Sequence, residues 1–95
     1  MAERNIQNKI HNLESVSTYD AVFACLMDAI IENSSVEIEY TNQRNETIVR
    51  TIHPKRFELI KRFYKRMSRL CISAYCEIKQ EERVFALMRI NELRR

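Results

Sequence analysis

The stretch from residue 36 to 42 reads VEIEYTN, and it contains the change of hydrophobic period that decides the fold. Every second side chain is apolar and those between are polar, with Val36, Ile38 and Tyr40 alternating with Glu37, Glu39 and Thr41. A period of two residues is typical of a β-strand with one face toward solvent. We therefore expect a half-exposed strand here.

The segment before this strand has a helical period instead. Between Thr18 and Asn33, apolar residues recur at spacings of three and four: Val22, Leu26, Ala29 and Ile30, joined by Phe23 and Met27. Ser17 is a candidate N-cap, and the polar residues 33–35 end the pattern. We predict a helix over about 18–33. Residues 1–16 form either a short helix or a loose arm.

The segment after residue 42 predicts further strands. Residues 42–45 form a turn, 46–53 a second strand, and Pro54 a bend or an edge, after which 57–60 continue extended. Residues 62–68 form a hairpin tip, 70–78 alternate as a strand with Cys71 outward, and 79–82 turn the chain. Residues 83–90 are apolar on both faces and predict one long, central or covered strand.

The predicted fold is therefore α+β: an N-terminal helix followed by five short, consecutive antiparallel strands. A small, strongly bent β-barrel is the economical arrangement, because closure hides the sheet edges. The 95 residues suffice for one domain. We divide the chain into an arm or short helix over 1–16 and a domain over 17–95, with strands between about 36 and 93.

Composition excludes several classes of protein. The sequence has no glycine, so it has no glycine-rich phosphate loop. It shows no long apolar run and no secretory signal, and its three cysteines lack a CxxC spacing, which together favour a cytoplasmic protein with reduced thiols. The residues predict neither a catalytic constellation nor a metal site, so we expect a protein that is not an enzyme and uses no cofactor.

Charge is segregated along the chain. Residues 1–42 carry a net charge of −5, residues 43–70 carry +7, and residues 71–95 carry +1. Segregation of this kind points to an anionic partner for the middle of the chain. It does not identify the anion.

Four short motifs, in order and in register, resemble the WYL domain. They are Ile38-Glu39-Tyr40, then residues 50–54 (RTIHP), then residues 73–77 (SAYCE), and finally residues 83–90 (RVFALMRI). The resemblance covers roughly 60 residues, from Val36 to Leu93. It implies a bacterial or phage regulatory module, a sensor linked to transcription regulation, with an Sm-like (SH3-type) barrel preceded by a helix.

The sequence departs from the family pattern at the namesake residues. Leu70-Cys71-Ile72 stands in place of Trp-Tyr-Leu, so Cys71 removes an aromatic ring from the face where family members are thought to hold a ligand. The helix-turn-helix and C-terminal extension usual in the family do not fit, so we expect an isolated module or a fragment of a longer regulator.

The resemblance implies a basic pocket that binds phosphates of single-stranded DNA or RNA, or of a nucleotide. Its candidate residues are Arg50, His53, Tyr75, Arg83 and Arg89. Arginine binds phosphate oxygens in pairs, and tyrosine stacks on a base. The alternatives are that Arg83 and Arg89 pair with Glu77, Glu81 or Glu92 and that His53 and Tyr75 are structural.

A second basic group surrounds two aromatic residues in the predicted hairpin. Phe63 and Tyr64 lie among Lys61, Arg62, Lys65, Arg66 and Arg69. Such a segment suits a nucleic-acid platform, a solvated hairpin or a protein-docking surface. The sequence therefore supports two functions: a sensor of nucleic acid or nucleotide, or a protein-interaction module that forms a homodimer or an accessory subunit.

Overall fold

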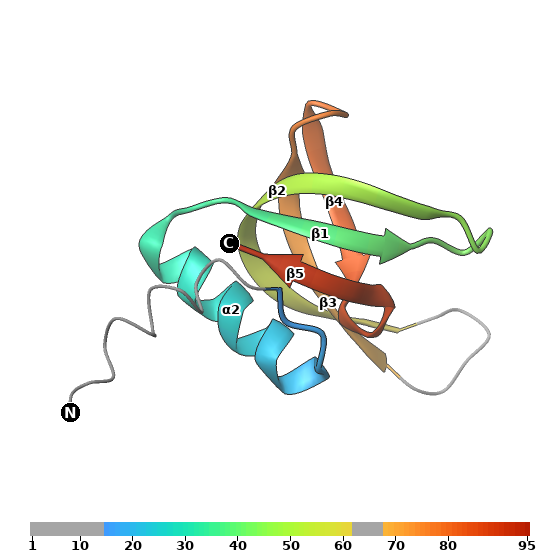
Figure 1. Ribbon diagram of the computed structural model, residues 1–95, viewed down its shortest axis with the longest axis horizontal. Coiled ribbons are helices and arrows are strands. Elements are labelled where there is room, and N and C mark those ends of the chain that lie inside the picture. The colour runs from blue at the N-terminus through green and yellow to red at the C-terminus, as the bar shows by residue number, and fades with distance from the viewer. Residues whose placement is uncertain (1–14, 62–67) are drawn as a thin grey trace.

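The computed structural model describes residues 15–61 and 68–95, which form one helix and one five-stranded antiparallel sheet (Figure 1). The sheet order is β4-β3-β2-β1-β5. The predicted order of a helix followed by antiparallel strands is confirmed. The elements are α2 (Tyr19–Glu32), β1 (Val36–Thr41), β2 (Thr47–Lys61), β3 (Ser68–Cys76), β4 (Glu81–Ala86), the 3₁₀ turn η1 (Leu87–Arg89) and β5 (Ile90–Arg94).

Helix α2 has a polar cap at each end. The Thr18 side chain accepts a hydrogen bond from the backbone N–H of Ala21 at 3.2 Å, so Thr18 is the N-cap and the prediction of Ser17 was wrong by one residue. Asn33 ends the helix in the left-handed conformation, with φ 56°. Asparagine tolerates this conformation better than most residues, which suits a chain without glycine.

The core lies between α2 and one face of the bent sheet. We call this face the inner face; its buried residues include Ile38, Ile52, Ile72, Ala74 and Phe85. The helix contributes Val22, Leu26 and Ala29, and it contacts β2, β5 and η1. Phe23 also stacks on Phe57 of β2, with ring centroids 4.6 Å apart.

Strand β2 is one long strand where the sequence predicted two. It continues through Pro54, and its pairing with β3 shifts register between Pro54 and Arg56. A bulge at this point accommodates a residue that has no N–H to donate. The first part of β2 pairs with β1 and the rest with β3, so the bend predicted at Pro54 lies inside a strand and bends the sheet.

The prediction of one long strand over 83–90, central or covered, was wrong. The chain leaves β4 after Ala86, turns through η1 and enters β5 at Ile90. Leu87 is buried at the turn, whereas Met88 is 64% exposed. The sequence looked apolar on both faces of the predicted strand because it contains a turn whose Leu87 packs in the core. Strands β4 and β5 then lie at opposite edges of the sheet.

No pairing between β4 and β5 occurs among the residues that the structure describes, so the sheet is not closed by strand pairing. A side chain partly bridges the gap. The backbone N–H of Ala86 in β4 donates to the Tyr40 hydroxyl of β1 at 3.0 Å. Tyr40 also meets Phe85 edge to face, with ring centroids 5.1 Å apart.

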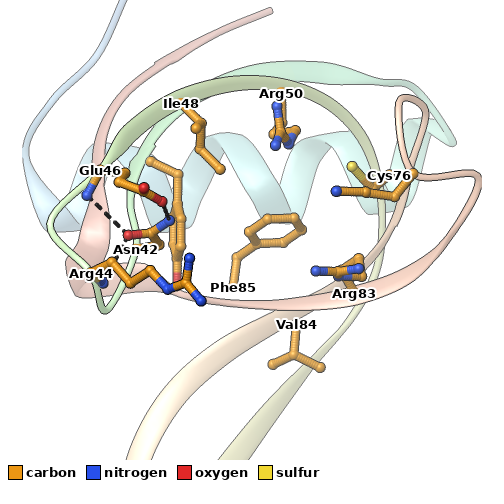
Figure 2. Close-up of a pocket in the computed structure, with 11 residues that line it drawn as sticks. Asn42, Arg44, Glu46, Ile48, Arg50, Cys76, Arg83, Val84 and Phe85 are labelled. Carbon is orange, nitrogen blue, oxygen red and sulfur yellow. Dashed lines mark hydrogen bonds between the residues drawn. The ribbon is translucent and has the colours of Figure 1, made fainter.

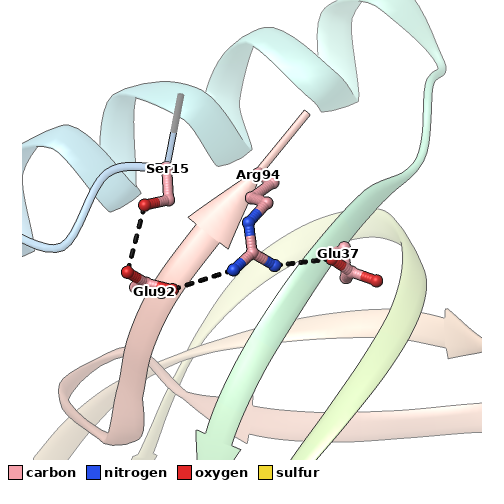
Figure 3. Close-up of polar contacts among 4 residues, drawn as sticks. All are labelled: Ser15, Glu37, Glu92 and Arg94. Carbon is pink, nitrogen blue, oxygen red and sulfur yellow. Dashed lines mark hydrogen bonds and ion pairs between the residues drawn. The ribbon is translucent and has the colours of Figure 1, made fainter. Parts of the chain in front are cut away.

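The segment before the helix covers the outer edge of β5. Val16 and Leu93 exchange two backbone hydrogen bonds of 2.9 Å. Ser15 donates to Glu92 at 3.1 Å, and Arg94 contacts both Glu92 and Glu37 (Figure 3). Residues 1–14 of the predicted arm lie outside the described residues, and the boundary between residues 16 and 17 stays a prediction.

The opposite face of the sheet, here called the outer face, is less exposed than the alternation in β3 predicted. Cys71 and Ser73 point to this face yet are 5% and 2% exposed. Their cross-strand neighbours include Glu58 for Cys71 and Arg56 for Ser73. Arg56 contacts the carboxylates of both Glu58 and Glu82, and the Ser73 hydroxyl donates to Glu82. This polar cluster explains why Ser73 is buried although its side chain points to the outer face.

Candidate functional site

A cavity of about 520 Å³ opens beside the core, where the inner face meets the β1–β2 and β3–β4 turns. Its lining has three parts. The cations are Arg44, Arg50, Lys79 and Arg83; the apolar and aromatic walls come mainly from Tyr40, Ile48 and Phe85; and the polar rim includes Asn42 and Glu46. Cationic side chains thus surround an aromatic wall.

Strand geometry brings Arg50 and Arg83 together. Arg50 lies opposite Ile38 and Arg83 lies opposite Ala74, and both of those partners are fully buried on the inner face. Because cross-strand partners share a face, the two arginines also point inward. Figure 2 shows Arg50 and Arg83 projecting into the same space as Phe85.

The cavity keeps an excess of positive charge. Arg83 forms an ion pair with Glu81. Within residues 15–61 and 68–95, Arg44, Arg50 and Lys79 have no carboxylate within ion-pair distance, and Arg50 donates only to the backbone of Val49. Three cations therefore remain available to an anion.

Arg44 and Lys79 are site residues that the sequence did not single out. Each lies in a turn, Arg44 between β1 and β2 and Lys79 between β3 and β4. Arg44 belongs to the +7 segment, which was the available signal. The residue pattern of a single strand does not predict that these two turns lie beside the same cavity, because their proximity depends on the bend of the sheet.

His53 and Tyr75 lie on the outer face, away from Arg50 and Arg83. They are cross-strand partners, with ring centroids 5.9 Å apart. His53 contacts Glu77 through Nε2 at 2.7 Å. Residues 50 and 53 are an odd number apart on β2, so their side chains point to opposite faces. The structure thus divides the family-implied set between two faces.

Arg89 lies outside the cavity lining. It sits in η1 and Arg83 sits in β4, so the two arginines do not share one strand as the prediction of a strand over 83–90 required. The Nη1 of Arg89 donates to the backbone carbonyls of Thr41 and Asn42 at 3.2 and 3.0 Å. These contacts are structural, but they are made with carbonyls and not with a glutamate, which was the alternative to ligand binding. Its Nε is buried with no hydrogen-bond partner among the described residues, and such a group costs roughly 1–3 kcal/mol.

The predicted basic hairpin is described only at its two ends. Lys61 is exposed at the end of β2. Arg69 lines a second cavity of about 250 Å³, together with Ile60, Cys71 and Val84. Arg62, Lys65 and Arg66, with Phe63 and Tyr64, lie outside the described residues.

The described residues offer little for metal or nucleophilic chemistry. Across 15–61 and 68–95, no three His, Cys, Asp or Glu side chains gather as metal ligands do. None of the three cysteines, which all lie among the described residues, forms a disulfide. Burial raises the pKa of the Cys25 thiol above its ordinary value, Arg95 opposes this shift and Asp28 adds to it. A raised pKa disfavours the reactive thiolate.

Comparison with known proteins decides the family. The sequence profile described as the WYL domain matches residues 21–95, which is most of the chain. This chain belongs to the WYL domain family. The four motifs of this WYL domain correspond to β1, the middle of β2, the end of β3, and β4 with η1. Of the namesake positions, Cys71 and Ile72 are buried and Leu70 is half-buried.

A solved structure supports the assignment. This WYL domain is similar to a chain of proteasome accessory factor B/C (PafBC) of Arthrobacter aurescens, with a TM-score of 0.66 and 29% sequence identity. The similarity covers 79% of this chain and 11% of that one, so the chain spans a small part of the larger protein's length. No curated protein matches the sequence. Among the described residues, no helix is long and apolar enough to cross a membrane.

Proposed function

We propose that this WYL domain is a non-enzymatic, cytoplasmic sensor that binds single-stranded nucleic acid or a nucleotide in the 520 Å³ cavity. The observation that carries the proposal is the convergence of Arg44, Arg50, Lys79 and Arg83 on one cavity, three of them without a carboxylate partner among the described residues. Unpaired cations in a recess attract phosphate, and arginine binds it through two parallel hydrogen bonds.

The cavity also supplies groups suited to a base or a sugar. Tyr40 and Phe85 present aromatic surface, and Asn42 and Glu46 provide hydrogen-bonding groups at the rim. A phosphate would lie between Arg50 and Arg83 while a ring contacts the aromatic wall. Glu46 at the rim repels closely spaced negative charges, which favours a nucleotide unit, whose base and sugar are uncharged, over inorganic polyphosphate.

We also propose that the fold is an Sm-like (SH3-type) barrel that is open between β4 and β5. The hydrogen bond from Ala86 to the Tyr40 hydroxyl supports this, because it links β4 to β1, the strand that pairs with β5. The same tyrosine lines the cavity. Closure of the barrel and shape of the binding site would then depend on one side chain.

Fluorescence anisotropy tests the function. Labelled single-stranded DNA, single-stranded RNA, duplex DNA and a fluorescent nucleotide are titrated with the domain at 50 and 200 mM salt. With three phosphates contacted, single-strand affinity should fall roughly twentyfold between these salt concentrations. Binding of any probe that is insensitive to salt would contradict a phosphate-directed site.

Substitutions of arginines test whether the cavity is the binding site. The double variant Arg50→Ala/Arg83→Ala should lose at least about a hundredfold in affinity, because each charged hydrogen-bonding group contributes about 1.5–3 kcal/mol. The matched control is Arg56→Ala/Arg94→Ala, which removes the same charge from arginines already paired with glutamates outside the cavity. Equal losses in the two variants would refute the cavity as the site.

A protein-interaction module is the second candidate function. Val84 and Met88 are 47% and 64% exposed, and they lie on and just after the edge strand β4. An edge strand beside exposed apolar side chains is suited to pairing with another chain. Light scattering distinguishes this candidate: a homodimer that Met88→Asp dissociates supports it, whereas a monomer with intact nucleotide binding favours the sensor.

A further inference from the structure

The half-buried side chain of Arg89 lies against the backbone at the end of β1, where the β1–β2 turn begins. Its Nη1 donates to Thr41 and Asn42 carbonyls, as described above. It belongs to η1, which is fixed in the core by Leu87 and followed by buried Ile90, at 2% and 5% exposure. Arg89 therefore joins a rigid part of the fold to the start of a turn.

Asn42 organises that turn. Its side-chain oxygen accepts hydrogen bonds from the backbone N–H groups of Arg44 and Glu46, at 2.9 and 3.0 Å. Its side-chain nitrogen donates to the Glu46 carboxylate at 2.9 Å, and its carbonyl accepts from Asn45 as well as from Arg89. The orientation of the Asn42 peptide thus sets the path of residues 43–46, and Arg44 is carried on that path.

We propose that Arg89 is a positioning residue for the cavity. By holding the carbonyls of Thr41 and Asn42, it fixes the turn of residues 42–46 and so places Arg44 at the rim, without contacting the ligand itself. The consequence for binding rests on the proposed function, whereas the consequence for the turn does not.

The geometry separates this role from general support of the fold. Strand β1 has other contacts at the same end: Asn91 donates to the Thr41 hydroxyl at 2.8 Å, and the Thr41 and Thr47 hydroxyls lie 3.2 Å apart. Loss of Arg89 should therefore loosen the turn while the strand stays paired. The buried Nε has no hydrogen-bond partner within residues 15–61 and 68–95, so the two carbonyl contacts of Nη1 are the hydrogen bonds that hold the Arg89 side chain in this part of the fold.

Amide hydrogen exchange of the free protein tests the structural half. In Arg89→Met, the amides of Arg44 and Glu46 should exchange about tenfold faster, which corresponds to about 1.4 kcal/mol, while the Ile52 amide is unchanged. Arg89→Lys keeps the charge and a donor, and should restore part of the protection. Arg94→Met is the control of equal charge. Unchanged exchange at the turn, or equal acceleration at Ile52, would overturn the proposal.

A double-mutant cycle tests the binding half, with single-stranded DNA as the probe. Arg44→Ala and Arg89→Met should each weaken binding, and the double variant should be no weaker than Arg44→Ala alone, because Arg89 acts through Arg44. Additive losses would mean that Arg89 acts independently and would overturn the proposal. If the wild-type domain binds no probe, the proposed function fails, and the exchange experiment still decides the role of Arg89.

Discussion

The inner and outer faces of the sheet both carry basic side chains, but in opposite electrostatic situations. On the outer face, Arg56 contacts Glu58 and Glu82, and His53 contacts Glu77. On the inner face, Arg50 has no carboxylate partner among the described residues, and only Arg83 is paired there. Basic residues that are neutralised in place support the fold, whereas those left without partners in a recess are available to a ligand. Pairing therefore identifies the site better than the charge count.

Charge reversal on the inner face should have the largest effect on binding. Arg50→Glu places a carboxylate beside Arg83 and should abolish detectable binding of single-stranded DNA, a loss of more than about a hundredfold. The control is Lys55→Glu, an exposed residue of the same strand outside the described cavities, with the same change of charge. Anisotropy titration measures both variants, and a comparable loss in Lys55→Glu would remove the distinction between the faces.

Restoring the family tyrosine on the outer face should destabilise the fold. Cys71 is 5% exposed, so Cys71→Tyr inserts a ring where little space remains and should lower the free energy of unfolding by about 1–3 kcal/mol. Urea denaturation followed by circular dichroism measures the change, with Cys71→Ser as the small-residue control. An unchanged midpoint would mean that the adjacent cavity of about 250 Å³ accepts the ring.

The salt dependence of affinity should also distinguish an inner-face arginine from an outer-face arginine. Arg50→Ala should reduce the slope of log affinity against log salt by about 0.7, the value for one phosphate contact on a single strand. Arg56→Ala should leave the slope unchanged, because Arg56 is already paired with glutamates. Titrations at four salt concentrations give both slopes. Equal slopes in wild type and Arg50→Ala would place the phosphate elsewhere.

Substitutions of the outer-face aromatic pair should have the smallest effect. His53→Ala and Tyr75→Ala should each change affinity by less than about twofold, a difference of roughly 0.4 kcal/mol, because both side chains lie away from the cavity. This outcome differs from what the family resemblance implied for these residues. A loss in Tyr75→Ala comparable to that in Arg50→Ala would show that the ligand reaches the outer face.

The sequence predicted the elements better than their connections. Alternation identified β1 and the helical period identified α2, because each of these segments has one buried face. Alternation of apolar and polar residues also identified β3, although Cys71 and Ser73 on its outer face are buried as well. It failed over residues 83–90, where Leu87 is buried in a turn and produces the same apolar pattern as a buried strand residue. The closed barrel was inferred from the need to hide edges, and strand pairing leaves β4 and β5 apart among the described residues.

The candidate site was predicted in part for the same reason. Arg50 and Arg83 were identified and converge, since each lies on a strand with a clear inner face. His53 and Arg89 were grouped with them by the family resemblance. Strand parity places His53 on the outer face, and Arg89 lies in a 3₁₀ turn and not on a strand with Arg83. Arg44 and Lys79 were missed, because the packing of two turns depends on contacts that no local pattern contains.

The most direct test of the account is an NMR titration of the ¹⁵N-labelled domain with a short single-stranded DNA. The account predicts that amide shifts concentrate on the cavity, at Arg44, Arg50, Lys79, Arg83 and Phe85, while His53, Arg56 and Tyr75 move little. Shifts centred on the outer-face residues, or no shifts at low salt, would contradict the assignment of the inner-face cavity as the binding site.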